Sequence, residues 1–376
     1  MALASSDQAR RRGLPKEKRI YVTVGAGGVG KTTVSAALGL GLAQAGHTTA
    51  VLTVDPARRL LQALNLGGAT GGELVEVEGC AGRLWAGALH VESALERLVE
   101  ELAPDGRAAK AVKANRVYRQ LIAGEGGVEE IAAVAQLYAL ARDSRFEAIV
   151  LDTPPAANAL EFLDAPRRLR EFLESRAIGL LLAAAGLESA KRQPSLRSRA
   201  VGATTTLLLR VFARATGSQL VGDLASFLEI VARARGQLIE RAAAVEQLLR
   251  EPQTGFLVVC VPDPVGTREA AAVADRLQRL GLPLLGVVVN RVHGQPAAKE
   301  RGAELSRRLG KAVAASLANR LAANLEYLRA LASGEQRAIE ELEATLAGTP
   351  LILLPELEED GGGLGALQEL GGVLLR

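Results

Sequence analysis

Short apolar runs alternate with long segments of helical periodicity along most of the chain. The runs are rich in β-branched residues and have the length of strands. Several are continuously apolar, which is typical of parallel strands that are covered on both faces. We expect strands at 19–24, 49–54, 84–89, 146–151, 256–261, 285–289 and 350–354. Because these strands alternate with helices, the pattern predicts an α/β fold with a doubly wound, mostly parallel sheet.

Two segments, 91–142 and 157–250, carry more helix than a simple crossover between strands requires. We expect them to form a helical insertion subdomain near the carboxyl edge of the sheet, where ligands bind in folds of this class. Residues 295–346 are helical as well. The predicted organisation is a basic flexible tail at 1–17, a single domain at 18–360, and a C-terminal helix or tail at 361–376.

A glycine-rich loop follows the first predicted strand, and residues 25–33 read GAGGVGKTT. The spacing of its last glycine, lysine and threonine predicts a phosphate-binding loop that opens a helix. Backbone N–H groups of such a loop surround phosphate oxygens, and the helix N-terminus adds positive potential. The residues expected to hold the nucleotide are Gly27, Gly28, Val29, Gly30, Lys31, Thr32 and Thr33. Thr32 has its hydroxyl placed for Mg²⁺.

Two carboxylates follow other predicted strands at the same edge of the sheet. Asp55, in Asp55-Pro56-Ala57, comes after strand 49–54 and could orient an attacking water or contact Mg²⁺. The alternative is that Asp55 only caps the next helix. Asp152 follows strand 146–151, and an apolar strand that ends in aspartate is the expected Walker B partner, which holds Mg²⁺ directly or through water.

Two further polar residues lie at and after the end of strand 285–289. Asn290 carries an amide that can read adenine through its donor and acceptor pair. The alternative is that Asn290 is a turn residue. His293 is one of three histidines, and because the sequence offers no second ligand nearby, we interpret it as structural.

Composition narrows the possible functions. The net charge is +3, and aromatic residues make up only 3% of the chain, so stacking platforms for nucleic-acid bases are not expected. Cys80 and Cys260 lie far apart and form no CxxC pair, which argues against a zinc or thioredoxin-type site. Cys260 lies in an apolar run, where we expect a buried, inert thiol. No apolar segment reaches the length of a bilayer span, so we expect a soluble, cytoplasmic protein with only indirect membrane contact.

In their order, these motifs resemble the arsenical pump (ArsA) and tail-anchored-protein targeting (Get) ATPases, which belong to the deviant Walker A class. The resemblance covers about residues 18–360 and is tightest in a bacterial ArsA-like subgroup. It implies ATP and Mg²⁺ as cofactors. It also implies that Lys31, Thr32 and Thr33 bind phosphates and Mg²⁺, that Asp55 orients the attacking water, and that Asp152 holds Mg²⁺ through water. Lys31 and Asp55 are the implied catalytic residues.

The same resemblance implies that two segments bind the base of the nucleotide. Asn290 would contact adenine, and the loop that begins Pro355-Glu356 after the last strand looks like the loop that flanks it. The preference for adenine over guanine rests mainly on this resemblance.

The sequence departs from the family at several positions. The signature lysine, which reaches the nucleotide of the other subunit, is replaced by Ala26. A homodimer would therefore lack this charge at both sites, and we expect a heterodimer with a related ATPase that carries the lysine, with a homodimer as the alternative. Arg58 or Arg59 could also substitute for it. Asn158 replaces a histidine, the zinc-binding CxxC is missing, and Met1 is the only methionine.

The function that the resemblance implies is a dimeric switch ATPase that couples nucleotide state to an apolar client segment, as in membrane-protein targeting or a chaperone-like role. One alternative is a regulatory or catalytically weak subunit of a heterodimeric ATPase. Another is a positioning ATPase of the Min/Par type. An arsenite pump subunit is not expected, because Cys80 and Cys260 cannot supply the thiolates of the family's metalloid site.

Overall fold

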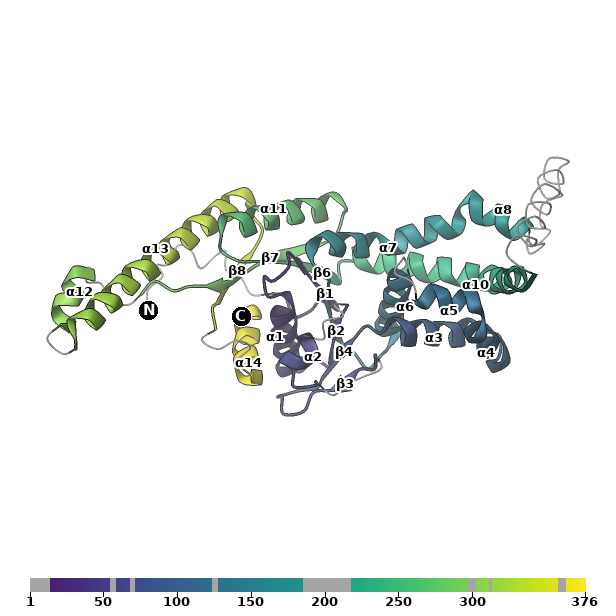
Figure 1. Cartoon of the computed structure of the whole chain (residues 1–376), viewed down its shortest axis with the longest axis horizontal. Helices are drawn as coiled ribbons and strands as arrows, with labels where there is room; N and C mark the ends of the chain where they lie inside the picture. The colour runs from purple at the N-terminus through teal and green to yellow at the C-terminus, as the bar shows by residue number, and fades with distance from the viewer. Residues whose placement is uncertain are drawn as a thin grey trace.

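An eight-stranded sheet forms the centre of the described part of the molecule (Figure 1). The computed structural model describes residues 14–54, 59–67, 72–123, 128–184, 218–296, 302–310, 313–357 and 363–376. The strands are β1 (Ile20–Gly25), β2 (Thr49–Thr53), β3 (Val75–Glu76), β4 (Leu84–Ala88), β5 (Ala148–Asp152), β6 (Thr254–Cys260), β7 (Leu284–Val292) and β8 (Leu351–Pro355). Their order is β3-β4-β2-β5-β1-β6-β7-β8, and only the pair β3–β4 is antiparallel. The predicted mostly parallel α/β fold is confirmed.

Helices cover both faces of this sheet. They are α1 (Lys31–Gln44), α2 (Arg59–Ala63), α3 (Val91–Leu102), α4 (Gly106–Ala114), α5 (Arg116–Ala123), α6 (Val128–Arg142), α7 (Ala156–Glu174), α8 (Arg176–Ala184), α10 (Ser218–Arg250), α11 (Pro264–Arg279), α12 (Gly302–Leu309), α13 (Ala315–Thr345) and α14 (Gly363–Leu374). Helices α1, α2 and α14 lie on one face, and α7 and α11 lie on the other (Figure 1).

The core is divided between these two faces by the alternation of side chains along each strand. In β1, Ile20 and Val22 join the apolar cluster under α6, α7 and α11. Tyr21, between them, joins the cluster under α1 and α14. All three side chains are fully buried. Because both faces are covered, the strands are apolar on both sides, which explains their continuous apolar runs.

The helical insertions pack against one another beyond one end of the sheet (Figure 1). Leu95 and Leu98 of α3 lie in a buried cluster with residues of α6. Two ion pairs join the long helix α10 to its neighbours: one joins Arg241 to Glu101 of α3 at 2.6 Å, and the other joins Glu246 to Arg170 of α7 at 3.0 Å. The segments 91–142 and 157–250 therefore meet in space, although a strand separates them in sequence.

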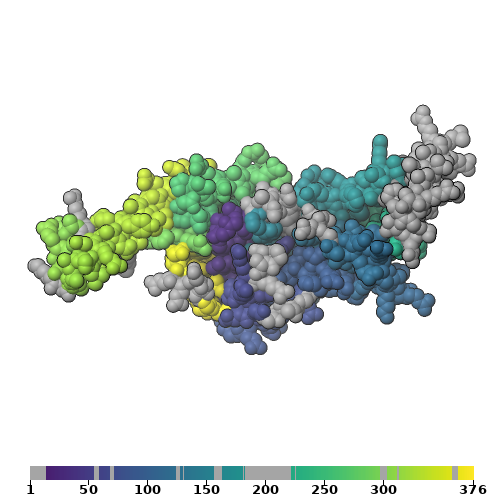
Figure 2. Space-filling view, viewed as in Figure 1, coloured from purple at the N-terminus to yellow at the C-terminus, as the bar shows by residue number. Residues whose placement is uncertain are grey.

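A pair of helices projects from the opposite end of the molecule (Figures 1 and 2). We call residues 302–310 and 313–333 the helical arm; it contains α12 and the first half of α13. The second half of α13 rejoins the body, where Ile339 and Leu342 enter the core cluster under α11. The arm follows β7 in the chain, so it leaves the body from the carboxyl edge of the sheet.

The last helix, α14, is a structural part of the body. It packs on α1, and Gly41 and Gly371 meet where the two helices touch. A Cβ at Gly371 would overlap the carbonyl oxygen of Ala37, so the close approach requires glycine there. Leu14 N–H donates to the carbonyl of Leu374 at 2.7 Å and fixes the start of the described chain to this helix. Residues 1–13 of the predicted basic tail lie outside the described residues.

All seven predicted strands are present, with shifts of up to three residues at their ends. The strand β3 has no predicted counterpart, because two edge residues carry no recognisable pattern. The strand β7 runs on to Val292, so Asn290 lies inside it rather than after it. None of the helices in the described ranges is long and apolar enough to cross a membrane.

Candidate nucleotide site

The glycine loop joins the end of β1 to the first turn of α1. Gly28 and Gly30 have φ angles of 80° and 93°, in the left-handed region that favours glycine. Gly25 packs so closely on β6 that a Cβ would overlap the carbonyl oxygen of Val259. The N-cap of α1 is Gly30, which has no side chain of its own to cap the helix. The loop therefore presents backbone N–H groups and the positive end of a helix dipole, which suits a phosphate.

Lys31 lies in the first turn of α1 and folds back over the loop. Its ammonium group donates a hydrogen bond to the carbonyl oxygen of Ala26 at 2.8 Å, and its side chain is largely buried. An ammonium held over the loop is positioned to exchange this carbonyl for phosphate oxygens. Ala26 itself packs against the apolar cluster under α1.

Asp152 ends β5 and is surrounded by hydroxyl groups. One carboxylate oxygen, Oδ2, accepts hydrogen bonds from Thr32 and Thr53, each at 2.9 Å. The other oxygen, Oδ1, accepts a longer bond of 3.4 Å from Ser35. Asp152 is fully buried. These contacts join the phosphate loop helix, β2 and β5 around one carboxylate.

The donor set of this cluster fits Mg²⁺. Hydroxyl and carboxylate oxygens are the ligands that this cation prefers, and its remaining positions are commonly filled by phosphates and water. Thr32 and Asp152 already lie within 2.9 Å of each other. They would hold a Mg²⁺ ion between the phosphate loop and β5.

Thr53 is a member of the site that the sequence did not single out. It ends β2, and strand pairing places it directly beside Asp152 of β5. On the other side of β5, Thr23 of β1 occupies the same level of the sheet. The sequence could have suggested these residues, because each lies near the end of a predicted strand. Only the register between strands makes them neighbours.

The segment after β2 falls partly outside the described residues. Asp55, Pro56, Ala57 and Arg58 lie there, so the roles predicted for Asp55 and Arg58 stay predictions. The described chain stops at Val54, whose N–H donates to the carbonyl of Asp152 at 2.9 Å. Val54, the last described residue before this gap, therefore lies beside Asp152.

Asn290 supports the phosphate loop from β7. Its amide nitrogen donates to the carbonyl oxygen of Val29 at 3.0 Å, and the residue is 5% exposed. A Cβ at Gly30 would overlap this amide nitrogen. The β7–β8 pairing is interrupted between Val289 and Val292, and Arg291 has a φ of 63°. This bulge turns Asn290 toward the loop. The predicted contact with adenine stays a prediction.

The loop after β8 lies next to the same bulge. Pro355 is paired with Val292 at the end of the two strands. The N–H of Glu356 donates to the carbonyl of Val292 at 3.2 Å, and its carboxylate lies 3.9 Å from the guanidinium of Arg291. The segment predicted to flank adenine is thus joined to the strand that carries Asn290.

His293 follows the bulge and bonds twice to a buried glutamate on α13. Its backbone N–H donates to Oε2 of Glu335 at 2.8 Å, and its Nδ1 lies 2.7 Å from Oε1. Glu335 is 7% exposed. This arrangement agrees with a structural histidine. Sequence reasoning missed Glu335, because it lies 42 residues away.

The cysteines do not join the site. Cys260 is buried in β6, and burial raises the pKa of its thiol to about 12. Burial also raises the pKa of Cys80 above its usual value. In the part of the chain that the structure describes, no cluster of three histidine, cysteine or acidic side chains could hold a metal ion.

The chain is similar in sequence to known ATPases. Residues 18–185 match the family model described as anion-transporting ATPase. ATPase ARSA1 of Chlamydomonas reinhardtii is 29% identical over 306 residues, which are 74% of this chain and 36% of that protein. ATPase GET3B of Arabidopsis thaliana is 26% identical over 303 residues, which are 73% of this chain and 64% of that protein.

A bacterial relative is aligned over more of the chain. A protein of Aquifex aeolicus, provisionally named arsenical pump-driving ATPase 1, is 22% identical over 361 residues, which are 94% of this chain and 77% of that protein. By contrast, the chain spans about a third of the algal relative and less than two thirds of the Arabidopsis one. The matched family segment contains the glycine loop, β2 and Asp152. Over this segment and over the alignments with the three relatives, the chain is similar to the ArsA/Get-type ATPases.

Proposed function

We propose that this chain binds and hydrolyses Mg-ATP and acts as a nucleotide-dependent switch. The observation that carries the proposal is the hydrogen bond from Thr32 to Asp152, at the base of a glycine loop with an open helix N-terminus. Phosphate-binding loops need these two oxygen ligands for the metal and this backbone for the phosphates.

Each residue of the loop has a role in this proposal. Lys31, whose ammonium group bonds to the carbonyl of Ala26, would bind the β- and γ-phosphates. Thr32 would hold Mg²⁺ through its hydroxyl, and Asp152, to which that hydroxyl is bonded here, would hold it through water. The bound metal supplies positive charge where negative charge develops on the transferred phosphoryl group. Asp55 orients the attacking water, and Thr33 binds phosphate in the first turn of α1.

The base of the nucleotide would lie over the carboxyl ends of β7 and β8. Asn290 keeps its carbonyl oxygen available while its amide nitrogen bonds to Val29. Pro355 and Glu356 flank the same place. The proposal is that this edge binds adenine.

Ala26 shapes the proposed assembly. A lysine at this position would bring a positive charge to the γ-phosphate of the other subunit, in the way an arginine finger does. With alanine here, the site of any partner lacks that charge. We therefore propose a heterodimer with a related ATPase that carries the lysine. The lysine of the partner would complete the site of this chain, while Ala26 leaves the site of the partner incomplete. The alternative is that this chain is a regulatory or catalytically weak subunit.

The helical insertion is the proposed output of the switch. Phe172 on α7 and Leu180 on α8 are 59% and 55% exposed, which is high for large apolar side chains. The helices α7 and α8 lie on the side of the body opposite to the helical arm (Figure 1). An apolar client segment, as in membrane-protein targeting or a chaperone-like role, would bind on this subdomain. The apolar segment 207–212 of the same insertion lies outside the described residues.

ATP binding and turnover test the nucleotide chemistry. Lys31→Ala should reduce ATP affinity by at least about a hundredfold, because it removes the charge on the phosphates. The exposed lysine Lys110 on α4 provides the matched control, and Lys110→Ala should bind ATP normally. Titration calorimetry with Mg-ATP and a phosphate-release assay give the two readouts. Tight ATP binding by Lys31→Ala would overturn the proposal.

Mass photometry tests the proposed assembly. The chain is mixed with a related ATPase that carries lysine at the position of Ala26, with and without Mg-ATP. A new species at the summed mass is the expected result. A mixture that holds only homodimers, together with full turnover by this chain alone, would contradict the heterodimer and leave the ATP site intact.

A further inference from the structure

An apolar stripe runs along the exposed side of the helical arm. It consists of Leu317, Leu321, Asn324, Leu328 and Leu331 on α13, with spacings of four, three, four and three residues. Leu317 and Leu321 are 42% and 43% exposed, Asn324 is exposed, and the last two are partly exposed. Successive steps of three and four residues place all five on one side of the helix.

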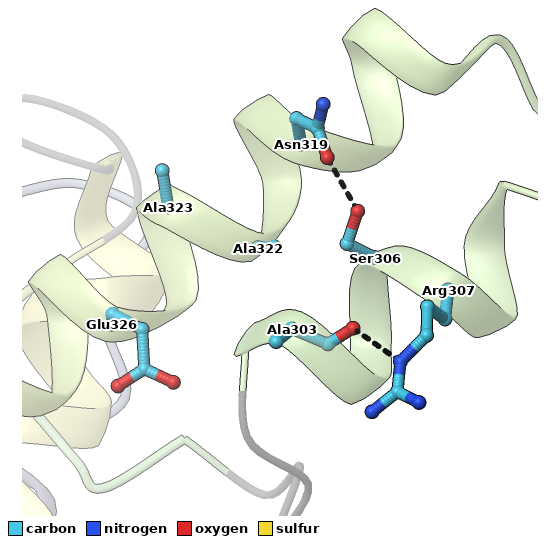
Figure 3. Close-up of a pocket in the computed structure, with 7 residues that line it drawn as sticks. All are labelled: Ala303, Ser306, Arg307, Asn319, Ala322, Ala323 and Glu326. Carbon is cyan, nitrogen blue, oxygen red and sulfur yellow. Dashed lines mark hydrogen bonds between the residues drawn. The ribbon is translucent and has the colours of Figure 1, made fainter.

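The helix α12 covers the other side of α13. Ser306 of α12 donates to the side-chain oxygen of Asn319 at 2.5 Å (Figure 3). Around this bond, the two helices enclose a shallow hollow of about 490 Å³, lined on α13 by Asn319, Ala322, Ala323 and Glu326. By the 3.6-residue turn, these positions lie opposite the stripe. The stripe therefore faces away from the hollow between α12 and α13. Figure 2 shows that the helical arm projects from the body at this end.

The spacing of the stripe identifies the shape of its partner. Alternating steps of four and three residues form the narrow seam that packs knobs-into-holes against another helix. A helix that lies on a lipid surface needs a broad apolar face. Here Arg320 and the 65% exposed Tyr327 adjoin the seam on one side. An asparagine in the middle of the seam, Asn324, is the residue type that fixes the register of paired helices.

The charge of the arm identifies the chemistry of that partner. Its described charged residues are Arg307, Arg308, Arg320 and Arg329 against Glu304 and Glu326, which gives a net charge of 4 − 2 = +2. Arg329 forms an ion pair with Glu326 at 3.1 Å. A second copy of the arm would bring the same positive charge to the seam, whereas carboxylates beside the seam of a partner helix would complement it.

We propose that the stripe on α13 is the docking face for an acidic amphipathic helix of another protein. The partner helix carries apolar residues at the same four-and-three spacing and glutamate or aspartate on their flanks. This inference is separate from the proposed nucleotide chemistry. The docking face contains no residue of the glycine loop, and it needs no nucleotide to form. It gives the ATPase a second surface, at the end opposite to the proposed client site.

A labelled peptide tests the docking face on the full chain. The probe is a helical peptide of about four heptads with leucine at the two seam positions, one asparagine, and glutamate on the flanks. Its twin has lysine in place of every flanking glutamate. Fluorescence anisotropy should show binding of the acidic peptide with a Kd of about tens of micromolar, and at least about tenfold weaker binding of the twin.

Substitutions on α13 test whether the acidic peptide binds to the stripe. Leu321→Asn should weaken binding of the acidic peptide by at least about tenfold, whereas Ser316→Asn, at an exposed position of α13 outside the seam, should leave it unchanged. Arg320→Glu should weaken the acidic peptide and strengthen the lysine twin, which a merely destabilised arm would not do. All three positions are exposed, and circular dichroism confirms that the variants are folded.

Three results would overturn the inference: no binding of the acidic peptide, equal binding by Leu321→Asn, or a self-association of the chain that Leu321→Asn abolishes in sedimentation velocity. The last result would assign the stripe to a second copy. ATP binding is measured on the same variants. If the chain binds ATP but not the acidic peptide, the docking face is rejected and the ATP site stands. If it binds the peptide but not ATP, the ATP site is rejected and the docking face stands.

Discussion

The side-chain amide of Asn290 donates to the carbonyl of Val29 at 3.0 Å and joins the end of β7 to the phosphate loop. The two residues are 261 positions apart in sequence. The adjacent bulge, with Arg291 at a φ of 63°, aims the amide at the loop. A non-glycine residue in this region costs about 1–2 kcal/mol, so the rest of the fold must hold the bulge in place. Asn290 therefore ties the loop geometry to the strand that approaches the proposed base site.

Removing this contact should weaken the nucleotide site. Asn290→Ala leaves the buried carbonyl of Val29 without its amide partner, and we expect a loss of about 1–2 kcal/mol in the free energy of unfolding. ATP affinity should fall about tenfold, because the loop is less well ordered before binding. Urea unfolding and titration calorimetry measure the two quantities. The exposed Asn324 supplies a control, since Asn324→Ala should change neither.

A double-mutant cycle with Gly30 isolates the contact. Gly30→Ala introduces a Cβ that overlaps the Asn290 amide and also strains a φ of 93°. In the Asn290→Ala background, the overlap is relieved and only the strain remains, so the two losses of stability should not add. Additive losses would mean that Asn290 does not press on Gly30.

The hydroxyl of Thr53 should tune the metal site without being a ligand. Thr53→Val keeps the volume of the buried side chain but removes its hydrogen bond to Asp152. We expect the Mg²⁺ concentration for half-maximal ATP binding to rise about three- to tenfold, because the carboxylate loses a partner that orients it. Thr49→Val, buried in the same strand and bonded to the carbonyl of His47, is the control. Identical Mg²⁺ dependence in both variants would show that Thr53 has no such role.

Introducing the missing lysine at position 26 is a second test of the proposed assembly. Ala26→Lys gives each subunit of a homodimer the charge that the γ-phosphate of its partner lacks. We expect turnover by this chain alone to rise at least about tenfold, below the much larger effects known for such charges. Ala26→Gln, of similar length and without charge, should not raise it. Phosphate release over a range of protein concentrations measures the change, which should grow as dimers form.

The buried carboxylate of Glu335 should hold α13 to the end of β7. It accepts from the backbone N–H of His293 at 2.8 Å and lies 2.7 Å from its Nδ1. Glu335→Ala should lower the free energy of unfolding by about 1–3 kcal/mol, because the backbone N–H and the partly buried ring of His293 lose their carboxylate partner. Glu335→Gln should retain most of the stability. Glu341→Ala, at an exposed position of the same helix, is the thermal-unfolding control; a loss equal to that of Glu335→Ala would contradict the assignment.

The two thiols should differ in their response to pH. Cys80 has a raised pKa, so a thiol-specific reagent should label it more slowly than free cysteine at pH 8, with a rate that rises with pH as thiolate forms. Cys260 should stay unlabelled in the folded protein, since its pKa is raised to about 12 by burial. Mass spectrometry after labelling identifies the modified residue. Labelling of both thiols before unfolding would contradict the burial of Cys260.

The raised pKa of Cys260 should make the folded chain less stable at high pH. The pKa of Cys260 is higher in the folded chain, about 12, than its reference value of 9.0. Its contribution to stability is therefore fully present below pH 9 and is lost as the pH rises toward 12. Cys260→Ala should reduce the loss of stability over that interval, which urea unfolding at several pH values measures.

Local patterns in the sequence determined the strands and the phosphate loop. A strand covered on both faces needs mostly apolar side chains on both sides, so β1, β2 and β6 appear as largely apolar runs. The loop is also local, because the left-handed turns at Gly28 and Gly30 and the helix that starts at Lys31 involve neighbouring residues. Family resemblance then followed from these motifs and their order.

Only the tertiary structure decided which distant residues meet. Thr53 reaches Asp152 because two parallel strands pair in one register, and a shift of one residue would turn its hydroxyl to the other face. Asn290 reaches Val29 through a bulge that the pattern of β7 does not reveal. Glu335 lies next to His293 because α13 packs back on the body. Hydrophobic periodicity reports whether a position is buried, but it does not report which polar groups are buried together, since that depends on how separate elements pack.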